Sequence, residues 1–417
     1  MGMENVSQLL EEQTMLQNVI WVMICTFLIF FMQAGFAALE TGFGRKKNAG
    51  NIMLKNLVTT AIGTLVFYLV GYGLMYGTDA SGIVGTSGLF HAADLGEKGS
   101  FHGMPSGVFL FYQSAFCATA ATIVSGAIVG RTKLVSYIVF CILLSIFIYP
   151  VVGHWVWGGG LLESRGFHDF AGSTAVHSVG GWCALIGAKM VGPRLGKYRR
   201  NGTSRPIPGH NIPIAAIGVF ILWFCWFGFN CGSTGEASVK VGDIAVNTNL
   251  AAAASTLAAL LLTKIRYGKP DITMTLNGTL AGLVAVTGGC DIISHEAAIA
   301  VGVIAGICSA LAVEFIDKVM KIDDPVGATS VHLVCGVVGS VLTALFAKSG
   351  ALETMGMTRG AFVKTQVFGV VVVALYTAVM AYVAFRVIDK LIGLRVKDKI
   401  EIEGLDIHEH GMNAYVD

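Results

Sequence analysis

The feature that most constrains this chain is a series of long apolar segments, separated along its whole length by polar connections. A helix needs about 20 mostly apolar residues to cross the hydrocarbon core of a bilayer. Eleven segments meet that requirement, at roughly 16–39, 56–77, 106–130, 134–157, 169–192, 211–230, 245–264, 272–290, 294–317, 327–347 and 361–388. We therefore expect an all-α polytopic membrane protein that spans the cell membrane with eleven transmembrane helices.

The composition excludes several classes of protein. Charged residues make up 13% of the 417 residues, against about 25% in soluble proteins, so the chain has too few charges to cover a water-exposed surface. The net charge of only +2 argues against a nucleic-acid partner. The 9 cysteines show no CxxC or zinc-type spacing. We expect buried free thiols, with neither a metal site nor a cofactor.

The distribution of basic residues predicts the orientation of the chain. Cytoplasmic connections carry an excess of Lys and Arg. One set of alternate connections receives most of the 28 basic residues: Arg45, Lys46, Lys47, Lys55, Arg131, Lys133, Lys189, Arg194, Lys197, Arg199, Arg200, Arg205, Lys264, Arg266, Lys269, Lys318, Lys321, Arg386, Lys390, Arg395, Lys397 and Lys399. We therefore expect the N-terminus outside and the C-terminus in the cytoplasm.

Two similar segments predict an internal repeat. Residues 172–181 read GSTAVHSVGG and residues 327–336 read GATSVHLVCG. They belong to the fifth and tenth predicted spans, which run in opposite directions, and such a pair is typical of an inverted-topology repeat.

The repeat defines a five-plus-five organisation. Its halves would cover about 16–192 and 211–347, and the last helix, 361–388, follows them. These parts form one membrane domain, 1–388, and a cytoplasmic tail follows at 389–417.

Each half of the repeat contributes one intramembrane histidine, His177 and His332. A lone histidine in an apolar helix is usually structural, but two at equivalent positions of an inverted repeat come close to its pseudo-two-fold axis. Ionisable groups within spans commonly belong to a substrate pathway or a proton relay. Neutral imidazoles offer one donor and one acceptor each. Such a pair suits a small neutral solute or a proton better than a bare cation.

The outer ends of the spans carry a second group of candidate residues. Span four ends with Trp157 and three glycines, and span six ends in an aromatic run before Ser233. A belt of aromatic residues at the membrane interface would explain these rings. They would equally form a vestibule for a small cation, because aromatic faces bind cations by ~1–2 kcal/mol, a hydroxyl accepts an N–H and Asp169 adds negative charge. Composition leaves both readings open.

Several motifs in this sequence resemble the ammonium transporter family (Amt/Mep/Rh), and the Amt branch most closely. The similarity extends from about residue 16 to 415. The motifs are VWGGGLL at 156–162, DFAGSTAVH at 169–177, WFGFNCGS at 226–233, DDPVGATSVH at 323–332 and EGLDIHEHGMNAY at 403–415.

The resemblance implies a homotrimer in which each subunit has its own pore. Trp157, Ser233 and Phe116 match the outer ammonium site, with Tyr112 beside them, where many bacterial members carry Phe. Phe116 and Phe229 match the stacked rings that close the outer pore.

Further residues match positions inside the pore. His177 and His332 would be its twin histidines, hydrogen-bonded to one another. Asp169 would be the carboxylate that orders the outer site without touching the substrate. Trp226 and Thr287 fall at other pore-associated positions.

The chemistry of ammonium makes a proton step necessary. Ammonium and potassium are monocations of similar size, so size alone cannot separate them. Moving a bare cation into a dry pore costs many kcal/mol. With a lysine-like pKa of ~10.4, deprotonation at neutral pH costs only ~4–5 kcal/mol. We therefore expect ammonium, or methylammonium as its analogue, to lose its proton at the outer site and ammonia to cross the membrane.

Three alternatives compete with a transporter. A sensor would have to act through a partner protein, because the tail carries no output domain. An Rh-like channel would conduct CO2 or another gas. An intramembrane enzyme lacks a carboxylate or cysteine cluster near either histidine, and HEH at 408–410 is expected to be a solvated turn. The resemblance makes the tail a regulatory element that docks on the cytoplasmic face and can contact a PII-type regulator.

Overall fold

The computed structural model describes residues 3–92, 95 and 103–415, and helices occupy all eleven predicted ranges. The elements up to the first long connection are α1 (Met3–Phe43), η1 (Lys46–Asn48), α2 (Ala49–Val66), η2 (Phe67–Gly71), α3 (Tyr72–Tyr76), β1 (Asp79–Ala80) and β2 (Val84–Gly85). The next elements are α4 (Ser106–Ala127), α5 (Leu134–Leu143), η4 (Leu144–Ile148), α6 (Tyr149–Trp157), η5 (Glu163–Arg165), η6 (Ser173–Ser178) and α7 (Val179–Val191).

The remaining elements continue the same all-helical pattern. They are α8 (Ile212–Cys231), η7 (Gly232–Thr234), α9 (Lys240–Tyr267), α10 (Ile272–Val286), α11 (His295–Glu314), η8 (Phe315–Val319), η9 (Thr329–Val334), α12 (Cys335–Phe346), α13 (Ser349–Thr354), α14 (Arg359–Leu391), α15 (Asp398–Glu403) and α16 (Leu405–His410). The strands β1 and β2 form one antiparallel hairpin. The described part of the chain thus fits an all-α polytopic membrane protein.

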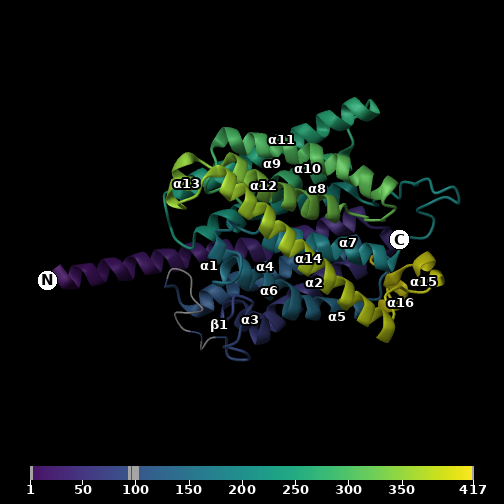
Figure 1. The fold of residues 1–417 in the computed structure, drawn as a ribbon. Helices are drawn as coiled ribbons and strands as arrows, with labels where there is room; N and C mark the ends of the chain where they lie inside the picture. The colour runs from purple at the N-terminus through teal and green to yellow at the C-terminus, as the bar shows by residue number, and fades with distance from the viewer. Residues whose placement is uncertain (1–2, 93–94, 96–102, 416–417) are drawn as a thin grey trace.

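Nine helical segments of the described residues are long and apolar enough to cross a membrane. Two predicted spans are not among them. The predicted span 272–290 is shorter in the structure, since α10 ends at Val286. The predicted span 169–192 corresponds to η6 and α7, which carry the polar side chains of His177 and Lys189. The first helix is longer than predicted: α1 begins at Met3, and its first turns extend beyond the bundle (Figure 1).

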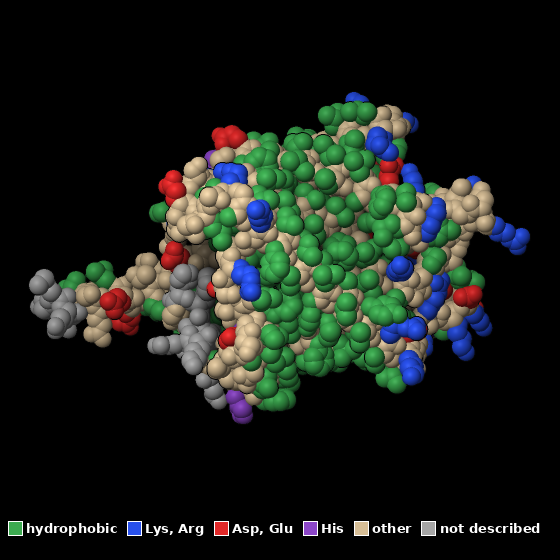
Figure 2. Space-filling model, viewed as in Figure 1, with side chains coloured by type: hydrophobic (Ala, Val, Ile, Leu, Met, Phe, Trp, Pro, Cys, Tyr) green, Lys and Arg blue, Asp and Glu red, His purple; other side chains and the backbone are tan. Residues whose placement is uncertain are grey.

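The surface of the bundle is divided into an apolar belt and two polar ends. Figure 2 shows the belt around the middle, and Lys and Arg gather at the end where α15 and α16 lie in Figure 1. Leu57, Phe220 and Leu375, on three of the apolar helices, are each at least 65% exposed, as expected of helices that face lipid or another protein surface. By the positive-inside rule, the end with the tail faces the cytoplasm.

Small residues bring the helices close together. A Cβ on Gly218 of α8 would lie 2.5 Å from the Leu39 nitrogen of α1, and one on Gly302 of α11 would lie 2.3 Å from the Ala251 oxygen of α9. Helices in a bilayer associate largely through such close packing. Eight of the nine cysteines are buried within this packing and all nine are free thiols, as predicted.

The C-terminal segment folds back on the cytoplasmic face. Asp406 accepts hydrogen bonds from the backbone nitrogens of Gly50, at 3.0 Å, and Asn51, at 2.8 Å. The expectation of a solvated turn at 408–410 was wrong in part. Glu409 accepts a hydrogen bond from the Asn51 side chain at 2.8 Å, and His410 lies 3.0 Å from the same amide, so this turn contacts the start of α2.

Candidate functional site

The two repeat segments form matching structures, although nothing in the residues predicted their form. Both η6 and η9 are π-helical turns, and each follows a glycine with positive φ, at 107° for Gly172 and 76° for Gly327. Asp169 accepts hydrogen bonds from the backbone nitrogens at the start of η6, and Asp324 does the same at the start of η9. Negative charge at these positions favours the free N–H groups of a helix start.

The repeat segments also contact each other reciprocally. A Cβ on Gly181 would lie 2.3 Å from the Leu333 nitrogen, and one on Gly336 would lie 3.1 Å from the Ser178 nitrogen. Gly181 and Gly336 are equivalent positions of the repeat, and so are Ser178 and Leu333. This exchange of equivalent contacts is the geometry of a pseudo-two-fold axis.

The paired histidines lie next to this contact. His177 Nδ1 and His332 Nδ1 are 3.2 Å apart, and their rings are 5.2 Å apart at an angle of 22°. The two residues are 0% and 4% exposed. One Nδ1 must donate a proton to the other, because a neutral imidazole has one donor and one acceptor. The pair is therefore a hydrogen-bonded unit in a dry part of the core.

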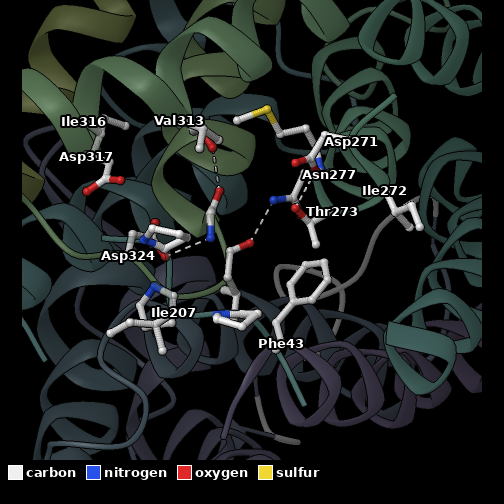
Figure 3. Close-up of a pocket in the computed structure, with 18 of the residues that line it drawn as sticks. Phe43, Ile207, Asp271, Ile272, Thr273, Asn277, Val313, Ile316, Asp317 and Asp324 are labelled. Atoms are coloured by element: carbon white, nitrogen blue, oxygen red, sulfur yellow. Dashed lines mark hydrogen bonds between the residues drawn. The ribbon is translucent and has the colours of Figure 1, made fainter. Parts of the chain in front are cut away.

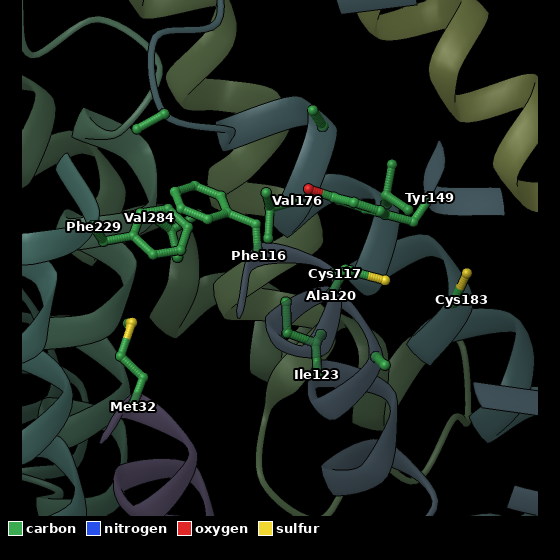
Figure 4. Packing of buried hydrophobic residues seen from close by; sticks show 14 of the residues in the cluster. Met32, Phe116, Cys117, Ala120, Ile123, Tyr149, Val176, Cys183, Phe229 and Val284 are labelled. Carbon is green, nitrogen blue, oxygen red and sulfur yellow. The ribbon is translucent and has the colours of Figure 1, made fainter. Parts of the chain in front are cut away.

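Two stacked phenylalanine rings cover the histidines on the outer side. The Phe116 and Phe229 rings are 4.2 Å apart at an angle of 26° (Figure 4). The Phe229 ring is 5.4 Å from the His177 ring. The Trp226 ring also stacks on the His177 ring, with 5.0 Å between the ring centres. His177 Nε2 has no hydrogen-bond partner among the described residues. The rings therefore separate this nitrogen from water.

The predicted outer residues come together above the stacked rings. The Tyr112 hydroxyl lies 2.8 Å from Ser233 Oγ, which donates to the Phe229 carbonyl at 2.9 Å. Trp157 meets Phe116 edge to face at 6.3 Å between ring centres. Trp157 and Ser233 are half-buried, whereas Tyr112 and Phe116 are buried. This arrangement offers an aromatic face and hydroxyl oxygens to a small cation.

Asp169 connects the outer residues to the π-helical turn. Its backbone oxygen accepts the Trp157 indole N–H at 2.8 Å, and its carboxylate caps η6. A Cβ on Gly172 would lie 3.1 Å from the Trp157 ring, so this glycine lets the indole approach the backbone. Asp169 thus orders the site through its backbone and carboxylate contacts.

Trp226 and Thr287 lie in a polar chain that the sequence showed only in part. Trp226 Nε1 donates to Thr287 Oγ1 at 2.8 Å, and Thr287 contacts Asn230 at 3.1 Å. Asn230 donates to Thr248 at 2.9 Å. These contacts fix the indole that stacks on His177. Neither Asn230 nor Thr248 was a predicted site residue. An asparagine or a threonine in an apolar helix often has a purely structural role, so its presence in the sequence does not indicate a site.

Two cavities lie on the cytoplasmic side of the histidines. The larger, of about 550 Å³, is lined by residues that include Phe43, Asp271 and Asp324 (Figure 3). The smaller, of about 20 Å³, is lined by His332. Asn277 lines both cavities, so it marks where they adjoin. The open volume beside His332 therefore adjoins a larger cavity toward the cytoplasmic face.

Buried charged residues join two cytoplasmic connections near these cavities, the one that follows α7 and the one that precedes η9. Asp323 accepts two hydrogen bonds from the Arg194 guanidinium, each at 2.8 Å, and one from its backbone nitrogen. Burial alone would raise the pKa of Asp323, but Arg194 lowers it well below its ordinary value. Burial lowers the pKa of Arg131 to about 10. In the part of the chain that the structure describes, no three His, Cys, Asp or Glu side chains gather as a metal site would require.

The fold is that of a multi-pass membrane protein, and its core contains a buried histidine pair beneath two stacked aromatic rings. The family model of the ammonium transporter family matches residues 20–415, and the chain belongs to that family. Ammonium transport is the function that the family supports.

Similar proteins share nearly the whole chain. Ammonium transporter Amt2 of Archaeoglobus fulgidus is 43% identical, over 95% of this chain and 87% of that protein. Ammonium transporter 1 member 3 of Solanum lycopersicum is 34% identical, over 95% and 93%.

Solved structures share the fold. A structure titled "Sensor Amt Protein" has a TM-score of 0.92 and 40% identity, over 96% of this chain and 100% of that one. Mep2 of Saccharomyces cerevisiae has a TM-score of 0.83 and 26% identity, over 92% and 90%. The relatives are named as transporters, consistent with a protein that is not an enzyme.

Proposed function

We propose that the chain takes up ammonium by binding NH4+ at the outer site, removing its proton and conducting NH3 between the stacked rings to the histidine pair. The observation that carries this proposal is the 3.2 Å contact of two buried imidazoles beneath two stacked rings. A cation would lose its hydration at this point without any charged partner, whereas ammonia fits neutral donors and acceptors.

The outer residues provide the selectivity for a cation that donates hydrogen bonds. Trp157 and Phe116 offer ring faces, and Ser233 offers an oxygen lone pair that the contacts with Tyr112 and Phe229 do not use. Phe116 and Phe229 act as the gate. Potassium can use the ring faces, but it donates no hydrogen bond and cannot lose a proton.

The histidine pair provides the route for the proton. A proton that enters at His177 can be passed to His332, since their Nδ1 atoms share one hydrogen bond. Net transport would then move one positive charge with each ammonia molecule. The proton route makes transport electrogenic although the permeating molecule is neutral.

The test is uptake of methylammonium into liposomes that contain the purified chain, with potassium as competitor, and current measurement on a solid-supported membrane. Uptake that resists potassium, with an ammonium-evoked current, is expected. Absence of both would refute the transport mechanism. Uptake without current would remove the proton route and leave electroneutral ammonia conduction.

The similarity to the structure titled "Sensor Amt Protein" favours a sensor as the second candidate. A sensor would bind ammonium at the same outer site but transport it slowly, so the liposome assay separates the two. A comparison of methylammonium with CO2 in the same liposomes tests the gas-channel alternative.

We also propose that three copies assemble into a homotrimer in the bilayer, and that residues 389–417 form a regulatory tail that a PII-type protein can contact. The ordered contacts of Asp406 and Glu409 with α2 support a tail whose position responds to the membrane domain. Mass measurement in native membranes and pull-down with a PII protein test these two assemblies.

A further inference from the structure

The smaller cavity on the cytoplasmic side of His332 has a volume suited to one small molecule. It measures about 20 Å³, and a cavity of ~10–15 Å³ by this kind of measure can contain one water. Ammonia and ammonium are close to water in size. His332, Glu40 and Asn277 line the cavity together with apolar residues. A molecule in this cavity is therefore within reach of an imidazole, a carboxylate and an amide.

Glu40 is a buried acid within a membrane span. It lies in the last turn of α1 and is 2% exposed. Its Oε2 accepts a hydrogen bond from Ser125 Oγ at 2.8 Å, and Lys55 Nζ donates to the Ser125 carbonyl at 3.3 Å. Ser125 thus lies between the acid and the base, and no direct ion pair joins them among the described residues. If Glu40 and Lys55 formed a structural ion pair, we would expect the carboxylate and the ammonium group to be in direct contact.

The amide of Asn277 provides an acceptor at the same place. Its Nδ2 donates to the Val326 carbonyl at 3.0 Å, and its Oδ1 has no partner among the described residues although the residue is only 6% exposed. An unpaired buried acceptor costs about 1–3 kcal/mol unless a ligand or water satisfies it. Ammonium, with four N–H donors, would satisfy both this oxygen and the Glu40 carboxylate.

We propose that this cavity is an inner ammonium site, and that Glu40 is the acid that returns the proton to ammonia there. The inference rests on the proposed function. A proton removed from NH4+ at the outer site is accepted by the unpaired Nε2 of His177 beneath the stacked rings, and a proton then passes across the shared Nδ1 hydrogen bond to His332 and on to the Glu40 carboxylate. Ammonia that reaches the cavity takes this proton from the carboxylic acid, which leaves the carboxylate and NH4+. One ammonium ion thus leaves the cavity for each one that loses its proton outside.

The surroundings of Glu40 fit this exchange. The charged groups that act on the Glu40 carboxylate from neighbouring elements are Lys55 on α2, of opposite sign, and Asp324 in the connection before η9, of like sign. His332 faces the same cavity from η9 and the uncharged Asn277 faces it from α10, while the hydroxyl of Ser125 on α4 donates a hydrogen bond to the Glu40 carboxylate. Neighbouring charges of opposite sign act on the protonation of a carboxyl group in opposite directions.

The experiment compares two kinds of transport in the same proteoliposomes. Glu40→Gln keeps the size of the side chain and an oxygen for Ser125 but cannot carry a proton. We expect the ammonium-evoked current to fall at least about tenfold, since positioned acids and bases commonly contribute more than that. Electroneutral ammonia permeation, read as the internal pH change in stopped flow, should continue. Glu353→Gln, at an exposed site on α13, should change neither signal.

Three other results would contradict either the role of Glu40 or the proton route. A wild-type current in the Gln variant overturns the role of Glu40, and so does the loss of both signals in a folded variant. A wild-type chain without any current refutes the proton route itself, which separates the failure of the proposed function from the failure of this inference.

Two further variants test the site if Glu40→Gln does not fold. Ser125→Ala retains the acid but removes the hydroxyl that stabilises the carboxylate, so the pH at half-maximal current should rise. An unchanged pH profile overturns the inference. Gly126→Ala places a Cβ 2.4 Å from Val326 Cγ2 and 3.5 Å from Glu40 Cγ, so it should reduce both current and ammonia permeation. Full permeation in this variant would show that the substrate does not pass through the cavity.

Discussion

A single methyl group at Gly181 should separate the histidine pair. The Cβ of Gly181→Ala would lie 2.3 Å from the Leu333 nitrogen and 2.6 Å from its Cα, whereas ordinary contact begins at 3.4 Å. Backbone atoms must therefore move by about 1 Å. Leu333 follows His332, whose Nδ1 lies only 3.2 Å from His177, so a displacement of that size takes the pair beyond hydrogen-bond distance. Overpacking of this kind typically destabilises a fold by about 1–3 kcal/mol.

The matched control is Gly242→Ala in α9, where a Cβ would meet no atom within 4 Å. This change should stabilise the helix by about 0.4–1 kcal/mol. The free energy of unfolding in detergent and methylammonium uptake in liposomes measure the two effects. Gly181→Ala should lose most uptake, and Gly336→Ala should behave alike, because the two glycines are related by the repeat. Wild-type stability and uptake in Gly181→Ala would refute the close contact of the two segments.

Three further changes test other parts of the molecule. Alanine at both His177 and His332 should abolish ammonium-evoked current and weaken selectivity over potassium; unchanged selectivity in liposomes would remove the histidines from the mechanism. Asp323→Asn should cost about 3–5 kcal/mol at neutral pH, because it leaves Arg194 without its buried partner. The pKa of Asp323 is lowered in the folded state, so its contribution is present above pH ~4 and is lost as the pH falls further. The difference in unfolding free energy between wild type and variant should therefore be constant above about pH 5 and shrink in acid; a constant difference down to pH 3 would contradict the assignment. Asp406→Ala should release the tail from α2, seen as faster proteolysis near residue 400, whereas an unchanged cleavage rate would show that these two hydrogen bonds do not fix it.

Much of the architecture was predictable because the bilayer imposes a simple length requirement on apolar helices. The sequence placed helices in the right ranges, and the repeat predicted that His177 and His332 meet although 155 residues separate them. The interruption of those helices was not predictable. A π-helical turn depends on hydrogen bonds made by the surrounding backbone, and the residues of 173–178 would suit an ordinary α-helix equally well.

The residues that sequence reasoning missed share a physical reason. Glu40 appears in the sequence as one of several charges near a helix end, and only the packing of α1 against α4 brings it to the cavity that His332 also lines. Asp324 was visible as part of a family motif, but its relation to Asp169 becomes clear only when both cap π-helical turns. The contacts of the tail were also not predictable. Its mixed charges predict a solvated segment, whereas Asp406 accepts hydrogen bonds from two backbone nitrogens at the start of α2.

The two halves of the proposed pathway are alike at the centre and different at the ends, and in the proposed mechanism this difference gives the transport step a physical basis. At the centre, equivalent turns capped by Asp169 and Asp324 present equivalent histidines to each other. At the outer end, the stacked rings of Phe116 and Phe229 lie above His177, whose Nε2 has no partner among the described residues. At the inner end, Glu40 and His332 line the same small cavity. A symmetric pair can share a proton without preference for either side, so the asymmetry that separates proton removal from proton return must come from these ends.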